Sequence, residues 1–232
     1  MTSTMSAVRM RASAAVVALC SIVFAARPVR AQDPPPRIPW VVIDLHANIP
    51  RFPSDSQGLA DSRGMTLAEL PGSGLGAQVA LNLYPLKWKA VTFGVGMALM
   101  AGRSSQTPDA ATIAAAALSG LTAPRPAEEK FSTYAPQLSF NFGNGFGWSY
   151  ISGGLGQSMW SVVPQGQEGY PPDSEPLKTL NYGGGARWFM KRHVGFSLDV
   201  RFYAISPGTT YNGIVGSPRT TLTVISAGVS VK

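Results

Sequence analysis

Hydrophobic and polar residues alternate along much of this chain, and residues 194–204 show the pattern most clearly. The even positions from Val194 to Ala204 are apolar, while the odd positions include Asp199 and Arg201. A period of two predicts a β-strand with one apolar and one polar face. Because a tilted strand of about 9–11 residues can cross a bilayer, the apolar face could meet either a protein core or lipid.

Seven further segments have the same extended character, which makes eight predicted strands in all. They are residues 40–49, 75–83, 91–101, 134–142, 148–160, 180–190 and 221–231. Glycine is so frequent in residues 148–160 that the two faces of that strand cannot be told apart from the sequence.

The connections between these strands alternate between long and short. The long ones cover residues 50–73, 102–130 and 162–179, with a moderate one at 206–220, and the short ones cover 85–89, 143–147 and 191–193. Outer-membrane barrels have long external loops, short periplasmic turns and an even number of strands. A soluble sandwich predicts no such alternation, so the connections favour a membrane barrel.

The N-terminal segment predicts export. Arg9 and Arg11 precede an apolar run at residues 12–26, and small residues lie before the bond that follows Ala31. The run is shorter than the roughly 20 apolar residues of a spanning helix. We therefore predict a cleaved signal peptide at residues 1–31, a periplasmic lead-in at 32–39 and one barrel domain at 40–232.

The basic character of the chain belongs mostly to this signal. Removal of its four arginines lowers the formal net charge from +7 to +3. The remainder has no stripe of Lys and Arg interleaved with aromatic residues, which argues against a nucleic-acid partner.

Folding residues 180–204 as a hairpin indicates which face points inward. Antiparallel pairing places Gly185 opposite Asp199 and Gly183 opposite Arg201. Glycine opposite a long or charged side chain suits a narrow lumen. The reverse orientation would put Arg201 against lipid at a cost of about 2–4 kcal/mol, so the apolar face is predicted to meet lipid.

The predicted lumen contains a structural network of polar side chains. Its members are Asp44, His46, Arg187, Asp199 and Arg201. Arg187 would lie diagonally from Asp199, within reach of a long side chain, so we expect an ion pair between these two residues.

Aromatic residues gather beside the three short turns, where amphipathic rings favour the level of the lipid headgroups. They are Tyr84, Trp88, Phe146, Trp148, Trp188 and Phe189.

The second long loop contains an alanine-rich stretch at residues 108–119. A short external helix with Asp109 in its first turn fits this composition, and a flexible loop of small residues fits it equally.

With these features the chain resembles the small eight-stranded outer-membrane barrels related to OmpA, OmpX and the opacity proteins. The resemblance covers roughly residues 40–232 and is strongest in residues 181–189, followed by a basic turn and the sequence Asp199-Val200-Arg201. It implies an all-β fold, an eight-stranded antiparallel up-and-down transmembrane β-barrel in the cell outer membrane. The chain departs from that family in ending Val231-Lys232, where such barrels usually end in an aromatic residue.

Two histidines are the candidates for acid–base chemistry. His193 falls in a predicted periplasmic turn, whereas His46 projects inward beside Asp44, and Ser54 or Ser56 could approach it from the first loop. Some barrels of this size use a histidine and a serine to modify lipid A. A lumenal histidine beside a carboxylate is more often structural, and no second cluster completes a metal site, so we predict no catalytic residues, metal or cofactor.

The sequence therefore favours a structural or surface-interaction protein. We expect a monomer that contacts outer-membrane lipid and meets an extracellular partner through its long loops. Two alternatives stay open, namely a lipid A hydrolase or acyltransferase that uses His46 and a soluble lipocalin-like barrel that binds a ligand in its interior. A porin is disfavoured because eight strands enclose a space just wide enough for side chains.

Overall fold

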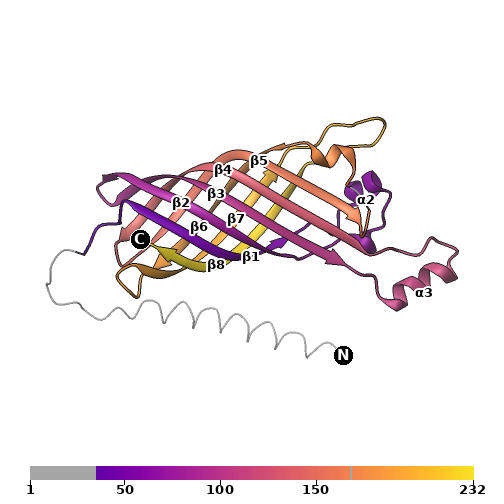
Figure 1. Ribbon diagram of the computed structural model, residues 1–232, viewed down its shortest axis with the longest axis horizontal. Coiled ribbons are helices and arrows are strands. Elements are labelled where there is room, and N and C mark those ends of the chain that lie inside the picture. The colour runs from indigo at the N-terminus through magenta and orange to yellow at the C-terminus, as the bar shows by residue number, and fades with distance from the viewer. Residues whose placement is uncertain (1–34, 168) are drawn as a thin grey trace, which may run out of the picture. The chain divides into compact units, whose positions relative to one another are not determined.

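The computed structural model describes residues 35–167 and 169–232, which form a closed antiparallel barrel of eight strands (Figure 1). The strands are β1 (Val41–Arg51), β2 (Leu75–Trp88), β3 (Val91–Gln106), β4 (Ala127–Asn144), β5 (Gly147–Pro164), β6 (Leu177–Trp188), β7 (Val194–Ile205) and β8 (Thr220–Val231). Each pairs with the next, and β1 pairs with β8, which confirms the predicted up-and-down barrel. The predicted signal peptide at residues 1–31 lies outside the described residues.

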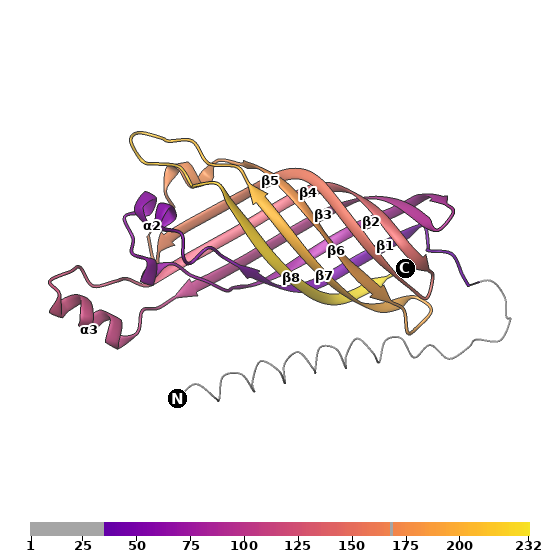
Figure 2. The ribbon, with the colours of Figure 1, turned by 180° about the vertical axis from the view of Figure 1, so that it is seen from behind.

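Long and short connections lie at opposite ends of the barrel, as predicted. The long ones carry the helices α2 (Gln57–Arg63) and α3 (Ala110–Leu118) and the 3₁₀ helices η1 (Leu67–Glu69) and η2 (Pro171–Ser174). Figures 1 and 2 show α2 and α3 at one end, here called the loop end, and the C-terminus near the other, the turn end. No helix within the described ranges is long and apolar enough to cross a membrane.

Helix α3 answers the question left open for residues 108–119. The Asp109 carboxylate accepts the backbone N–H of Thr112 at 2.6 Å and so caps the helix at its N-terminus. Alanine, the best helix former, occupies most of the positions that follow.

Strand β2 runs through the residues predicted to form the first short turn. Pro85 has no N–H to donate to the ladder, and the register with β3 shifts between Leu83 and Leu86. Such a bulge lets a strand continue past a proline. The turn is therefore reduced to Lys89 and Ala90, and Lys89 adopts the left-handed conformation with φ at 54°.

The register of the β6–β7 hairpin is the predicted one. Gly185 pairs with Asp199 and Gly183 pairs with Arg201. Strand β5, whose faces were ambiguous, points Tyr150 inward and leaves Leu155 71% exposed on the outside.

The barrel interior is stacked in three layers. An apolar cluster closes the turn end and consists of Ile38, Val42, Tyr84, Trp148, Tyr150 and Phe189. A larger apolar cluster at the loop end joins inward side chains of the strands, such as Phe131 of β4, to Leu59 of α2 and to Phe52, which follows β1. Asp44 and His46 lie on β1 between Val42 and the loop end, so the polar side chains form the middle layer.

The prediction that the aromatic residues beside the turns lie at the headgroup level is wrong for half of them. Trp88, Phe146 and Trp188 are exposed, but Tyr84, Trp148 and Phe189 are buried. The reason is strand parity, since Tyr84 and Trp148 occupy inward positions of their strands. Trp148 stacks on Phe189 with ring centroids 5.1 Å apart, and these rings fill the turn end.

The exterior of the barrel is apolar. Leu45 is 50% exposed and Leu99 is 54% exposed, whereas Asp44 and Arg201 are each 2% exposed. A polar interior and an apolar exterior are the reverse of a soluble ligand-binding barrel, so the lipocalin-like alternative is wrong. This surface belongs to a barrel whose strands span a lipid bilayer.

Candidate functional site

Asp44 of β1 is the centre of the polar layer. Its carboxylate accepts hydrogen bonds from Arg187 Nε at 2.9 Å and Nη2 at 2.5 Å, and the two side chains are only 2% and 3% exposed. Asn82 of β2 and Ser230 of β8 donate to the same carboxylate, at 2.9 Å and 2.5 Å. A bidentate pair of this kind is strong and directional, and here it connects β1 to β6 across the lumen.

Arg201 makes the second lumenal ion pair, with Asp199 two residues before it on β7. Arg201 Nε lies 3.2 Å from Asp199 Oδ1, and Nη2 lies 3.1 Å from Oδ2. The guanidinium also donates to side-chain oxygens on three other strands, which belong to Gln137, Ser152 and Asn181. Arg201 therefore links four strands by hydrogen bonds. The donor groups that make these bonds lie in the lumen and not in lipid.

The expected ion pair between Arg187 and Asp199 does not form. Asp199 is occupied by Arg201 on its own strand and by the hydroxyl of Tyr150, which donates to it at 2.7 Å. Arg187 lies over the Tyr150 ring, 4.1 Å from its centroid, and reaches Asp44 instead. Tyr150 thus stands between the two ion pairs.

Two neighbours exclude a side chain at Gly185. A Cβ atom there would overlap the backbone oxygen of Leu198 on β7 and would lie 2.7 Å from the Tyr150 hydroxyl oxygen. Contacts this short cannot be accommodated without moving both the β7 backbone and the Tyr150 ring. The sequence predicted that Gly185 makes room for the charged residue opposite it. In the structure Gly185 also makes room for Tyr150, which comes from the neighbouring strand β5.

His46 lies in the lumen, and its partner is Ser197 of β7 rather than Ser54 or Ser56. His46 Nε2 is 2.7 Å from Ser197 Oγ, which in turn is 2.9 Å from Ser230 Oγ. Ser56 caps α2 at the loop end instead. The other histidine, His193, lies at the turn end, where Nδ1 is 3.0 Å from the backbone oxygen of Lys232.

No carboxylate hydrogen-bonds the His46 imidazole in the part of the chain that the structure describes. Asp44 lies two residues before His46 on β1, but its oxygens accept from Arg187, Asn82 and Ser230. The second ring nitrogen of His46, Nδ1, is buried and has no hydrogen-bond partner among these residues. The pair of His46 and Ser197 therefore lacks the carboxylate that orients and stabilises a catalytic histidine.

Free space in the polar layer is minimal. A cavity of about 10 Å³ lies among its side chains, including Asp44, Arg187 and Arg201. That volume is near the lower limit for one water molecule. Side chains therefore fill this layer of the lumen.

A second polar cluster, which the sequence did not predict, joins three connections at the loop end. Arg63, at the end of α2, is ion-paired with Asp173 of η2, and the two side chains are 0% and 2% exposed. Arg63 also donates to Ser217 Oγ at 2.9 Å and to the backbone oxygen of Val215 at 2.8 Å in the last connection. We call these four residues the loop clamp.

The environment of the loop clamp is dry. Burial raises the pKa of Asp173, although the charge of Arg63 opposes this effect. The Tyr170 hydroxyl adds a hydrogen bond to the backbone oxygen of Arg63 at 3.2 Å. The residues of the loop clamp are far apart in sequence and belong to no periodic pattern, so the sequence carries no signal for their contact.

A smaller link joins the first and second long connections through Glu69. Its carboxylate accepts the backbone N–H groups of Thr66 at 2.6 Å and Arg125 at 2.7 Å. Burial acts to raise the pKa of Glu69, but these hydrogen bonds outweigh it and hold the pKa below its ordinary value. Three of the four long connections are therefore joined by the loop clamp, and the remaining one is joined to the first by Glu69.

No protein-family profile matches the chain, and no curated protein matches it. Among solved structures it is similar to the Neisserial surface protein A, with 14% identity and a TM-score of 0.51 over 84% of this chain and 97% of that chain. It is also similar to Ail, the attachment invasion locus protein of Yersinia pestis, with 11% identity and a TM-score of 0.39 over 82% of this chain and 95% of that chain. The first likeness shows the fold, and together with the apolar exterior it makes this chain a small eight-stranded barrel of the outer-membrane type.

Proposed function

We propose that this protein is a structural or surface-interaction barrel of the outer membrane, and that it neither catalyses a reaction nor conducts solutes. The network of Asp44, His46, Arg187, Asp199 and Arg201 is, in this proposal, a structural core. The observation that carries the proposal is the contrast between this filled lumen and the apolar helix that the loop end presents to solvent.

Two observations support a lumen without catalysis. His46 hydrogen-bonds Ser197, but its Nδ1 has no partner within the described residues, so this pair lacks the carboxylate that orients a catalytic histidine. Ser197 is fully buried, and the 10 Å³ cavity nearby cannot admit an acyl chain. Expression of the wild type and of His46→Ala should therefore leave lipid A with the same mass spectrum. A change in lipid A acylation that requires His46 would contradict the proposal.

The loop end supports a surface role. The loop clamp holds three connections in place, and α3 extends beyond them with no buried residue (Figure 1). Its side chains include Ile113 at 40% exposure and Leu118 at 90% exposure. An apolar helix that buries none of its own residues is a natural surface for a partner outside the cell.

Cells that display the protein provide the test. We expect Ile113→Ser/Leu118→Ser to reduce adhesion of such cells to surfaces coated with extracellular-matrix protein, while the barrel still folds. Leu67→Ser, which removes an exposed apolar side chain from another connection, is the matched control and should adhere like the wild type. Equal adhesion of all three and of cells without the protein would remove the surface-interaction role and leave the structural one.

A liposome-swelling assay tests the closed lumen. We expect no uptake of small sugars through the wild type, because side chains occupy the polar layer. Rapid sugar entry would mean that the lumen opens and conducts.

A further inference from the structure

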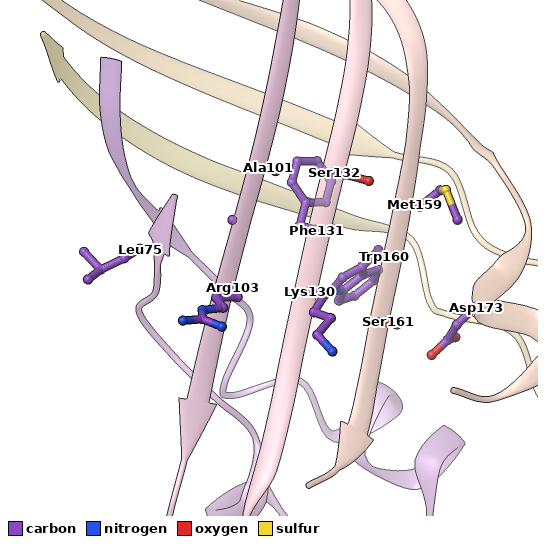
Figure 3. Close-up of a pocket in the computed structure, with 11 residues that line it drawn as sticks. Leu75, Ala101, Arg103, Lys130, Phe131, Ser132, Met159, Trp160, Ser161 and Asp173 are labelled. Carbon is purple, nitrogen blue, oxygen red and sulfur yellow. The ribbon is translucent and has the colours of Figure 1, made fainter. Parts of the chain in front are cut away.

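The barrel exterior has a groove near the loop end, on the face formed by β2, β3, β4 and β5. It has a volume of about 520 Å³, and its outward-facing lining residues on the strands are Leu75, Ala101, Arg103, Lys130, Ser132, Met159 and Ser161 (Figure 3). Asp173 of the loop clamp also lines the groove, but its charge is compensated by the ion pair with Arg63. A second groove of about 520 Å³ continues from it and shares Ala101, Ser132 and Met159. Volumes of this size lie within the range of small-molecule sites.

The shape of the groove follows from small side chains between large ones. Ala101 of β3 and Ser132 of β4 are direct cross-strand partners and form its floor. Leu75 and Met159 stand on either side, 73% and 50% exposed. Leu99 and Tyr134, the next outward pair of the same two strands, end this floor toward the turn end. The second groove widens the floor across β2 at Ala77, so the lipid-facing surface has a hollow with small residues in its floor and apolar side chains around it.

Two cations stand side by side at the loop end of this groove. Arg103 and Lys130 are cross-strand partners that both point outward, as Figure 3 shows. Like charges in this arrangement repel each other and destabilise a sheet. Lys130 has a partial compensation from Glu128, whose Oε2 lies 3.1 Å from Nζ, but within the described residues Arg103 has no ion pair.

The position of the pair matches the boundary between lipid tails and headgroups. Outward residues of β3 are apolar up to Ala101 and become charged at Arg103. Outward residues of β4 change in the same way between Tyr134 and Lys130. In an outer-membrane barrel the loop end faces the outside, so the two cations lie at the headgroup level of the outer leaflet.

We propose that this groove binds a lipid of the outer leaflet that carries a phosphate monoester, with the phosphate between Arg103 and Lys130 and an acyl chain along Ala101 and Ser132. A phosphate monoester carries about −1.5 to −2 charges at pH 7 and therefore suits two adjacent cations. A phosphodiester headgroup has a single negative charge and neutralises only one of them. Acylated sugar phosphates of the lipopolysaccharide type provide this chemistry in the outer leaflet.

Native mass spectrometry of the folded protein in detergent can test the proposal. Phosphatidic acid and phosphatidylglycerol with the same acyl chains serve as the monoester and diester probes. We expect the wild type to retain phosphatidic acid about tenfold more strongly than phosphatidylglycerol, because the second charge forms one more charge-assisted hydrogen bond. Diphosphoryl lipid A should be retained like phosphatidic acid.

Three variants distinguish the contribution of the two cations to lipid binding from the contribution of the apolar groove. Arg103→Gln/Lys130→Gln should abolish the preference for phosphatidic acid, whereas Ala101→Leu/Ser132→Leu should fill the floor and weaken retention of both probes. Arg51→Gln is the matched control, because Arg51 also lies at the loop end of its strand but pairs with Thr223 of β8, outside the groove. All of these residues face outward, and a heat-dependent shift in gel migration verifies that each variant is folded.

Three results would overturn the proposal. One is equal retention of the two probes by the wild type. Another is a preference that survives in Arg103→Gln/Lys130→Gln. The third is a loss in Arg51→Gln as large as in the double variant, which would assign the effect to net charge rather than to this groove.

Discussion

Arg187 Nη2 of β6 lies 2.5 Å from Asp44 Oδ2 of β1, and these two strands share no backbone hydrogen bond. The ion pair therefore spans the lumen rather than reinforcing a ladder. Each partner has its remaining surface covered, Asp44 by Asn82 and Ser230 and Arg187 by the Tyr150 ring. A charge at this place has no access to water if its partner is removed.

Replacement of Arg187 should therefore be severely destabilising. We expect Arg187→Leu to lower the free energy of unfolding by about 3–5 kcal/mol, because the Asp44 carboxylate would remain buried and unpaired. The midpoint of urea unfolding in lipid vesicles measures the loss. The double variant Asp44→Asn/Arg187→Leu leaves no charge and should lose less than the single variant; a double variant at least as unstable as the single one would contradict the argument.

Gly185 should not tolerate a side chain. Gly185→Ala would push its methyl group into the backbone oxygen of Leu198 and the side chain of Tyr150, and we expect a loss of about 1–3 kcal/mol, typical of overpacking. Gly153→Ala is the control, since the nearest atom to its added Cβ would be 3.4 Å away. If the two variants unfold at the same urea concentration, the close contacts at Gly185 do not determine the stability of the barrel.

The loop clamp should protect its own arginine from protease. Asp173→Asn removes the charge that holds Arg63, so trypsin should cleave after Arg63 faster in the variant than in the wild type. Arg192 is an internal reference in the same digest, because it is exposed in the short turn between β6 and β7, at the opposite end of the barrel. Cleavage after Arg192 should change little. An unchanged rate after Arg63 would show that the ion pair does not restrain α2.

Acid should loosen the link between the first and second connections. The pKa of Glu69 lies below its ordinary value, so its stabilising contribution is fully present above the ordinary glutamate pKa of about 4.3 and disappears as the pH falls through the lowered pKa. Amide hydrogen exchange at Arg125, corrected for the intrinsic rate, should accelerate over that pH interval. Glu69→Gln should remove the pH dependence, and a variant that retains it would assign the effect to another group.

The barrel could be predicted because two independent features of the sequence indicate it. One is the alternation of apolar and polar residues within the strands, and the other is the alternation of long and short connections between them. Seven of the eight strands alternate in residue type, and the β6–β7 register follows from Gly183 and Gly185 opposite charged residues. Both signals are local in sequence. Pairing between neighbours in an up-and-down barrel needs no information beyond the order of the strands.

The sequence predicts which polar residues lie in the lumen, but not which of them pair with each other. Whether Arg187 meets Asp199 or Asp44 depends on Tyr150, which comes from a strand whose faces glycine had obscured. Trp148 shows the same difficulty, because it lies on that glycine-rich strand. Tyr84 does not, since it continues the inward series Gln78, Ala80 and Asn82 of β2, and only its place beside the turn favoured an exposed ring. The loop clamp has no periodicity at all, and its contacts depend on how three connections pack together.

The hydrogen bond from Ser230 to Asp44 crosses the seam at which the first and last strands meet. A shift of that seam by one residue would turn Asp44 toward lipid and Ile43 toward the lumen. A shift by two would keep both faces correct but would separate Asp44 from Ser230 and His46 from Ser197. The polar side chains thus distinguish the native alignment from the even-numbered errors that hydrophobicity alone would accept.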